Sequence, residues 1–331
     1  PAYYMKYGLG KGWMGILFAV LMIITFGFAY NSVQSNTICL AWQKAFGIEP
    51  ATMGIVLTAL TLLIIFGGIQ RVAKFSSTVV PVMAVVYLLI AVGVVVWNIA
   101  SLPKVLLAIV ENAFGFNQAA GGVLGVTVIQ GIKRGLFSNE AGEGSAPNAA
   151  AVATVSHPVK QGLIQALGVF TDTLVVCSCT AFIILVSGVD VTASNGIQLT
   201  QDALTHEIGS IGNPFVAVMI WLFAFSSIIG NYYYGETNVR YIRDSKLGVF
   251  IYRLAVAAMV MVGAVVSLDF AWSFADITMA LLTLCNLVAI VLLSRQAVFL
   301  LQDYRQQKKE GKNPVFSKDK MPEIADKLEA W

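Results

Sequence analysis

Apolar runs of about 20 residues recur along the chain, and they constrain its fold more than any single motif. A helical run of this length matches the hydrocarbon core of a bilayer. The composition agrees, because 57% of the 331 residues are hydrophobic and only 12% are charged. A soluble domain carries about 25% charged residues. The sequence therefore predicts an all-α polytopic membrane protein.

The apolar runs and one interrupted stretch predict eight membrane crossings. The crossings are expected at about 12–34, 51–70, 78–98, 117–150, 160–186, 214–233, 248–268 and 273–296. Between them, 35–50 is predicted to be a loop with a short amphipathic piece, and Pro103 opens an amphipathic segment that ends near 114. Residues 187–213 are predicted to be a polar loop, and 298–331 a charged tail.

The distribution of cations predicts the orientation of these crossings. If each predicted span crosses once, one side receives most of the Lys and Arg residues outside the spans. Cytoplasmic loops carry such an excess. We therefore expect a multi-pass protein of the inner (plasma) membrane, with the cation-rich loops and the C-terminal tail in the cytoplasm. The cations on this side are Lys6, Lys11, Arg71, Lys74, Lys160, Arg240, Arg243, Lys246, Arg305, Lys308 and Lys309.

Residues 130–150 interrupt the apolar pattern with charges, four glycines and a proline. Each glycine costs about 0.8–1 kcal/mol relative to alanine in a helix interior, so we expect a helix at about 117–150 that is broken within the membrane. Unwound backbone at that depth must be buried in protein or line a cavity. Its free N–H and C=O groups suit a carboxylate and a cation. The alternative is that the small residues only allow close helix packing.

Charged residues near this break have more than one interpretation. Lys133 and Arg134 could form a gate, pair with Glu140 or Glu143, or mark a shallower membrane boundary. Charged side chains within membrane segments are rare and usually functional.

Other polar groups lie in the predicted spans. Gln34 ends the first span, where it could bind a ligand or cap the helix. Ser226 and Ser227, with the Phe223 carbonyl, offer three oxygens to a small hard cation, although serines often bond back to their own helix. Asp172, inside a later span, is expected either to form a structural pair or to take part in coupling.

The interrupted stretch also resembles a family signature. The segments that carry the signature are Arg134-Gly135-Leu136-Phe137-Ser138-Asn139-Glu140-Ala141-Gly142, Gly144-Ser145-Ala146-Pro147, Ala149-Ala150-Ala151, His157-Pro158 and Gln161-Gly162. With these segments, the chain resembles the sodium:alanine/glycine symporter family over nearly all of residues 1–300.

The resemblance implies a leucine-transporter-like fold with two inverted five-helix repeats. Residues 1–114 would be the remainder of the first repeat, with three membrane helices and an amphipathic segment. Residues 115–297 would be the second repeat, with five membrane helices, and 298–331 the cytoplasmic tail. Core helices three to ten are then expected here. Because the chain starts at Pro1 without Met, we expect an N-terminally truncated fragment that lacks the first two.

The resemblance also implies roles for single residues. Substrate contacts are expected at Gln34, Phe137, Ser138, Asn139, Ala141 and Gly142. Sodium ligands are expected at Ser226, Ser227 and the backbone carbonyl of Phe223. From the charged residues themselves, independently of the resemblance, the gate or coupling candidates are Arg134, Glu140 and Asp172. The chain departs from the family pattern at Glu143, where a small or apolar residue is expected, and at Asn231, where many members have Trp.

Together these features predict sodium-coupled symport of a small neutral amino acid, alanine or glycine, into the cell by alternating access. The expected partners are the amino acid, sodium as a co-transported ion and the lipid bilayer, with neither a cofactor nor nucleic acid. A proton-coupled transporter is the alternative, with Glu140, Glu143 or Asp172 as the proton carrier. An intramembrane enzyme that uses Glu140 with His157 is disfavoured, because the sequence lacks a motif such as His-Glu-x-x-His.

Overall fold

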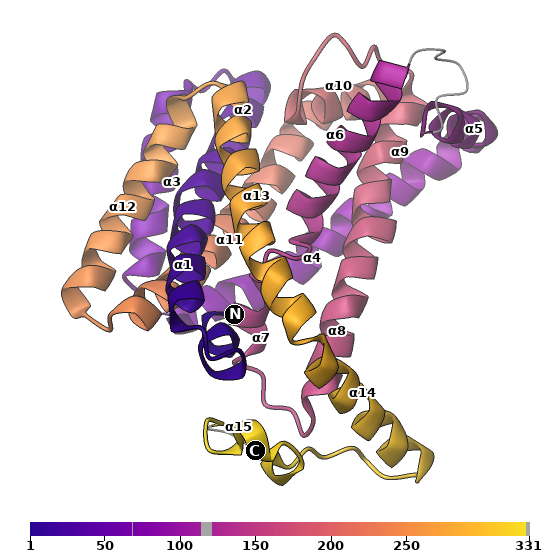
Figure 1. Ribbon diagram of the computed structural model, residues 1–331. Coiled ribbons are helices and arrows are strands. Elements are labelled where there is room, and N and C mark those ends of the chain that lie inside the picture. Colours follow the sequence, from indigo (N-terminus) through magenta and orange to yellow (C-terminus); the bar gives the residue numbers. More distant parts are fainter. Residues whose placement is uncertain (68, 114–120, 329–331) are drawn as a thin grey trace.

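The computed structural model describes residues 1–67, 69–113 and 121–328, and every regular element in these ranges is helical (Figure 1). The prediction of an all-α chain is thus confirmed for the described residues. The elements are η1 (Tyr4–Gly8), α1 (Gly12–Met22), η2 (Ile23–Tyr30), α2 (Asn31–Phe46), α3 (Pro50–Ile65), α4 (Ile69–Trp97), η3 (Ile99–Ser101), α5 (Leu102–Ala113), α6 (Gly121–Asn139), α7 (Ala146–Ala150), α8 (Pro158–Thr171), η4 (Asp172–Cys177), α9 (Ser178–Ser187), α10 (Ile197–Ile208), η5 (Gly209–Ile211), α11 (Gly212–Ile242), α12 (Lys246–Val265), α13 (Leu268–Leu292), α14 (Ser294–Lys309), η6 (Lys318–Lys320) and α15 (Pro322–Ala325).

Several of these helices are suited to a bilayer. By length and composition, five helical stretches of the described chain can cross a membrane: Gly12–Phe46, Pro158–Ser187, Ile197–Ile242, Lys246–Val265 and Leu268–Leu292. Pro81–Trp97 and Ile99–Ala113, bent by 71° at their junction, can form a sixth. The two other predicted crossings fall on the 16-residue α3 and on α6. Residues 114–120, which include the start of the predicted broken span at 117, lie outside the described residues.

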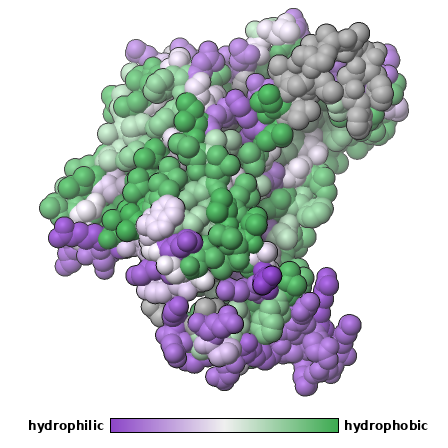
Figure 2. Space-filling model, viewed as in Figure 1, coloured by the Kyte–Doolittle hydropathy of each residue, from purple (hydrophilic) through white to green (hydrophobic). Residues whose placement is uncertain are grey.

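The surface agrees with a membrane location. In Figure 2 the visible face carries mainly apolar side chains across the middle of the molecule, and hydrophilic residues gather where α14 and the C-terminal segment lie. Large apolar side chains such as Leu63 (63% exposed) and Val291 (67% exposed) would face water in a soluble protein. An apolar surface of this extent is expected to contact lipid. The chain is therefore a multi-pass membrane protein.

The first predicted span ends too early. Residues 35–50 were predicted to form a loop, but α2 continues to Phe46 and ends at Gly47, whose φ of 67° is left-handed. The helix tolerates its polar residues because carbonyls of α12 and of its C-cap residue Val266 accept their hydrogen bonds. The Ser35 hydroxyl donates to the Val260 carbonyl (2.7 Å), and the Asn36 amide donates to the Gly263 (3.0 Å) and Val266 (2.8 Å) carbonyls.

The predicted loop at 187–213 is also partly wrong, because it contains α10. The buried face of α10 includes Leu204 and Gln201, and polar Gln201 finds carbonyl acceptors within the protein. Its side-chain amide donates to the Ala41 carbonyl at 3.0 Å and to the Asn213 carbonyl at 3.3 Å. The polar composition of 187–213 therefore led to the prediction of a loop where a packed helix is present.

The broken helix is present, and the break is confined to one turn. α6 runs through Gly131 and Gly135 to Asn139, so these two glycines do not interrupt it. The chain leaves the helix at Glu140, with φ of 50°, and returns to it at Ala146. Gly142 (80°) and Gly144 (82°) also have positive φ, which glycine adopts without steric cost. We call residues 140–145 the interrupting turn.

Close packing of α12 fixes the position of α2. A Cβ atom at Gly263 would lie 2.5 Å from the Cα and carbonyl oxygen of Ser32, so only glycine fits without a shift of one backbone. α11 packs against α2, and α13 packs against η2 and α1. These contacts hold α2 between α11 and α12 and hold η2 against α13.

The C-terminal segment folds back beneath the helices near the start of α8 (Figure 1). His157 is fully buried and caps α8, and its Nε2 lies 3.2 Å from the Asp303 carboxylate on α14. Lys320 binds the same carboxylate at 2.6 Å, and the Phe316 N–H donates to the Ser156 carbonyl at 2.9 Å. The predicted charged tail is thus docked on the turn that follows α7.

Asp303 is expected to make this docking sensitive to acid. Partial burial acts to raise the pKa of Asp303, but hydrogen bonds from Lys320 and His157 prevail and hold that pKa below its usual value. A carboxyl whose folded-state pKa is depressed contributes stability above its unfolded pKa, and this stability is lost as pH falls through the folded value. We therefore expect the tail to undock progressively below about pH 4.

Spin labels at Val152→Cys and Val315→Cys, introduced after replacement of the native cysteines, would report this change as a distance distribution. The distribution should be narrow at pH 7 and broad at acid pH, and Asp303→Asn should broaden it already at pH 7. The exposed Asp326→Asn is the matched control. A narrow distribution in Asp303→Asn would show that this carboxylate does not hold the tail.

Candidate functional site

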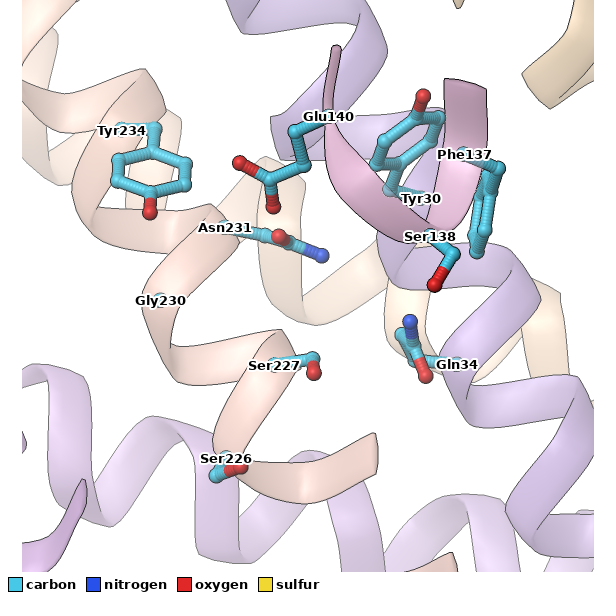
Figure 3. Close-up of a pocket in the computed structure, with 10 residues that line it drawn as sticks. All are labelled: Tyr30, Gln34, Phe137, Ser138, Glu140, Ser226, Ser227, Gly230, Asn231 and Tyr234. Atoms are coloured by element: carbon cyan, nitrogen blue, oxygen red, sulfur yellow. The ribbon is translucent and has the colours of Figure 1, made fainter. Parts of the chain in front are cut away.

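A cavity of about 540 Å³ lies beside the interrupting turn, between η2, α2, α6 and α11 (Figure 3). Its volume is within the range of small-molecule sites. The residues that line it come from three distant parts of the sequence. They are Tyr30, Gln34, Phe137, Ser138, Glu140, Ser226, Ser227, Gly230, Asn231 and Tyr234.

The cavity brings together six of the residues that the sequence singled out as substrate, sodium and coupling candidates. These are Gln34, Phe137, Ser138, Glu140, Ser226 and Ser227. In Figure 3, Gln34 and Ser138 lie on one side of the cavity, and Ser227 and Asn231 lie on the α11 side. The predicted residues outside this lining are Arg134, Asn139, Ala141, Gly142, Asp172 and Phe223.

Asp172 and Asn139 lie outside the cavity lining, and their hydrogen bonds join the end of α6 to η4. The Ser138 hydroxyl donates to the Asp172 carboxylate at 2.7 Å, and the Thr173 hydroxyl donates to the Asn139 side-chain carbonyl at 2.5 Å. Asp172 begins η4, a π-helical segment of a kind that is frequent at functional sites. Asp172 is therefore linked to the cavity by its hydrogen bond with Ser138.

Gly142 and Ala141 lie in the interrupting turn without lining the cavity. The Gly142 carbonyl accepts a hydrogen bond from the Asn286 amide of α13 at 2.8 Å. A Cβ at Gly142 would also lie 3.1 Å from the Leu287 side chain. In this arrangement Gly142 anchors the turn to α13, and Ala141 is exposed.

An aromatic row forms the wall of the cavity at Phe137. The Phe137 ring centroid lies 4.6 Å from that of Tyr30 and 4.7 Å from that of Trp272. The Arg134 guanidinium covers Trp272 at 4.0 Å from the ring centroid, a cation–π contact. Phe137 thus packs between Tyr30, which lines the cavity, and Trp272, which the Arg134 guanidinium covers.

Asp276 is the partner of the two adjacent cations. Arg134 Nη2 lies 2.5 Å from one Asp276 carboxylate oxygen, and Lys133 Nζ lies 3.2 Å from the other. The pairing with Glu140 or Glu143, one of the alternatives left open by the sequence, is absent from the ion pairs of the described residues. Asp276 was missed, although a carboxylate inside the apolar run 273–296 is itself a functional signal.

Ser226 and Ser227 share one acceptor. Their hydroxyls donate to the Phe223 carbonyl at 2.7 Å and 3.2 Å, so three oxygens gather on one turn of α11. This is the back-bonding arrangement expected of helix serines. A hydroxyl that donates a hydrogen bond keeps its lone pairs. Since both serines line the cavity, those lone pairs remain available to a cation there.

A chain of amides orients Asn231. Its Nδ2 donates to the Asn31 side-chain carbonyl at 3.2 Å, and Asn31 Nδ2 donates to the Gly27 carbonyl at 3.0 Å. Both side chains are buried. The donor group of Asn231 is therefore engaged inside the protein, while the residue itself lines the cavity.

Two carboxylates belong to the interrupting turn. Glu140 lines the cavity and accepts a hydrogen bond from the Ser145 hydroxyl. Glu143 is fully buried, and its Oε1 accepts a hydrogen bond from the Tyr30 hydroxyl at 2.7 Å. Both carboxylates are thus connected to the cavity, Glu140 directly and Glu143 through Tyr30.

Comparison with known proteins identifies the family of the chain. A family model described as the sodium:alanine symporter family matches residues 1–318. The chain belongs to the sodium:alanine symporter family. The resemblance inferred from the residues around Arg134–Gly142 is thereby confirmed.

Its curated relatives in this family are transporters. A probable sodium/glutamine symporter of Bacillus subtilis (strain 168) is 55% identical over 320 residues, which cover 96% of this chain and 67% of that protein. An amino-acid carrier protein of the same organism is 50% identical over 331 residues, 100% of this chain and 71% of that protein. A putative sodium/proton-dependent alanine carrier, also of that organism, is 40% identical over 333 residues, 96% of this chain and 69% of that protein.

Proposed function

We propose that this member of the family is a sodium-coupled symporter that carries a small neutral amino acid, alanine or glycine, into the cell. The observation that supports it most is the meeting of α2, α6 and α11 in one cavity. There Gln34 and Ser138 lie opposite the two serines of α11. Polar groups for a zwitterion and oxygens for a monovalent cation thus line one cavity.

The chemistry of the lining fits a neutral amino acid. Gln34 offers both a donor and an acceptor, and Ser138 adds a hydroxyl whose own proton is directed to Asp172. Ser226 and Ser227 would hold sodium with the Phe223 carbonyl, and no resident cofactor is needed. If ion and substrate both stabilise the same closed state, each raises the affinity for the other, which is the coupling that a sodium gradient requires.

We further propose a leucine-transporter-like arrangement of the helices. The turn between α6 and α7 would be the break in core helix six, with 1–114 and 115–297 as parts of two inverted repeats and core helices three to ten present. Such repeats rock around a fixed midplane site. The cation-rich loops and the tail 298–331 would face the cytoplasm.

Glutamine is a second candidate substrate. The first of the relatives described above is named for glutamine, and the cavity carries two carboxamides, those of Gln34 and Asn231. The Gln34 carboxamide and the side-chain carbonyl of Asn231 could pair with the carboxamide of a glutamine side chain. Proton coupling is the alternative to sodium alone, supported by the relative named a sodium/proton-dependent carrier and by Glu140 in the lining.

Uptake by the full-length protein in liposomes tests these proposals. Labelled alanine, glycine and glutamine would each be offered with an inward sodium gradient, with potassium in its place, and with a pH gradient alone. We expect accumulation of alanine or glycine that requires sodium. Accumulation driven by the pH gradient without sodium would reject sodium coupling, and accumulation of glutamine alone would change the substrate.

A further inference from the structure

Glu143 is a buried carboxylate without a counter-charge. Its side chain is 0% exposed, at the centre of the interrupting turn. Oε1 accepts the hydrogen bond from Tyr30, whereas Oε2 is buried and has no hydrogen-bond partner. Across the residues that the structure describes, neither Lys, Arg nor His forms an ion pair with it.

An ionised carboxylate in this position would be very unfavourable. Removing an isolated carboxylate from water is so costly that such a group takes up a proton instead. Glu140 adds to the effect, because it belongs to the same turn and a second negative charge there disfavours the ionised form of Glu143. The Glu143 carboxylate therefore needs a bound monovalent cation, either a proton or a metal ion, to neutralise it.

The neighbouring elements supply no such charge. Tyr30 of η2 faces Glu143 directly. Tyr4 of η1 bonds to Asn286 of α13, and Asn286 in turn holds the Gly142 carbonyl. The ring of Pro1 approaches Gly144.

The Lys and Arg side chains that lie near this region are already paired. On α6, Lys133 and Arg134 are held by Asp276. The α-amine of Pro1 also lies near the turn, but it forms none of the ion pairs of the described residues. The other titratable groups described around the turn are phenols, carboxyls and the Cys285 thiol.

A proton fits this position better than a metal ion. A sodium ion needs several oxygen ligands, and among the described residues Tyr30 is the one side chain that forms a hydrogen bond with the Glu143 carboxylate. A proton needs one oxygen. We propose that Glu143 is a proton-binding site of this transporter, distinct from the sodium ligands on α11. The proposal rests on the transport function proposed above.

Tyr30 connects this site to the cavity. The same side chain that binds Glu143 lines the cavity and packs its ring on Phe137. Loss of the proton leaves a negative charge on Glu143, next to the Tyr30 side chain that lines the cavity. It also strengthens the hydrogen bond from the Tyr30 hydroxyl, because hydrogen bonds to ionised acceptors are stronger. Proton binding and substrate binding are then coupled through Tyr30.

Infrared difference spectroscopy of the full-length protein tests the proton directly and does not depend on transport. We expect a carbonyl band of a protonated carboxylic acid at neutral pH that disappears in Glu143→Gln, which keeps the shape and the acceptor for Tyr30. Tyr30→Phe should shift the band, since it removes only the hydrogen bond. The exposed Glu49→Gln should leave it unchanged. An identical spectrum in Glu143→Gln would show that Glu143 is ionised and would overturn the proposal.

Uptake at saturating sodium provides the second readout. Wild-type uptake should fall at alkaline pH, by up to about tenfold per pH unit once Glu143 titrates, and Glu143→Gln should remove this dependence. A variant that keeps the wild-type pH profile, or loses affinity for sodium instead, contradicts the proposal. Absence of sodium-dependent uptake by the wild type would reject the proposed function alone, because the infrared band is read without transport.

Discussion

Replacing Ser226 and Ser227 together by alanine is expected to raise the sodium concentration for half-maximal uptake by about 100-fold. Interactions of a hydroxyl with a charged partner contribute about 1.5–3 kcal/mol each. Since about 1.4 kcal/mol corresponds to a tenfold change in affinity, each lost hydroxyl should weaken sodium binding about tenfold or more. Uptake measured against sodium concentration in liposomes reads this shift directly.

Controls separate cation binding from helix stability. Each single variant should show about a tenfold shift, and Ser227→Thr, which keeps a hydroxyl, should stay near the wild type. Ser187→Ala is the matched control, because Ser187 donates to the Ile184 carbonyl of its own helix and lies outside the cavity lining. An unchanged sodium dependence in the double variant would mean that the serines only bond back to α11.

The helical fold was largely predictable because lipid removes most alternatives to helices. Errors occurred where polar residues were satisfied by distant carbonyls. Ser35 and Asn36 look like the end of a span, yet α12 accepts their hydrogen bonds and α2 continues. Gln201 looks like part of a polar loop until Ala41 accepts its amide proton. Such acceptors lie more than 100 residues away, so no local pattern reveals them.

The composition of the site was predictable in part. The unusual chemistry of Ser138, Glu140 and the serine pair inside apolar spans indicated a site before its geometry was known. Their meeting depends on how α6 and α11 cross, which the sequence does not specify. For the same reason, the sequence indicated neither Tyr30 as the partner of Glu143 nor Asp276 as the partner of Arg134.

Asp276→Asn is expected to reduce uptake by about tenfold or more, with a larger effect than Arg134→Gln. The substitution leaves both Lys133 and Arg134 without their shared carboxylate. Loss of a charged hydrogen bond costs about 1.5–3 kcal/mol, reduced here because the cations are 40% and 41% exposed and partly screened by water. Arg134 would then no longer be held over Trp272, the ring that supports Phe137 in the cavity wall.

The rank order of the variants tests this connection. In Arg134→Gln the Asp276 carboxylate keeps Lys133, so uptake should fall less than in Asp276→Asn. Combining the two should cost less than the sum of their effects, because each removes the same ion pair. Asp269→Asn, an exposed carboxylate in the first turn of the same helix, should leave uptake unchanged. Additive losses, or equal losses in Asp269→Asn, would show that the ion pair does not position the cavity wall.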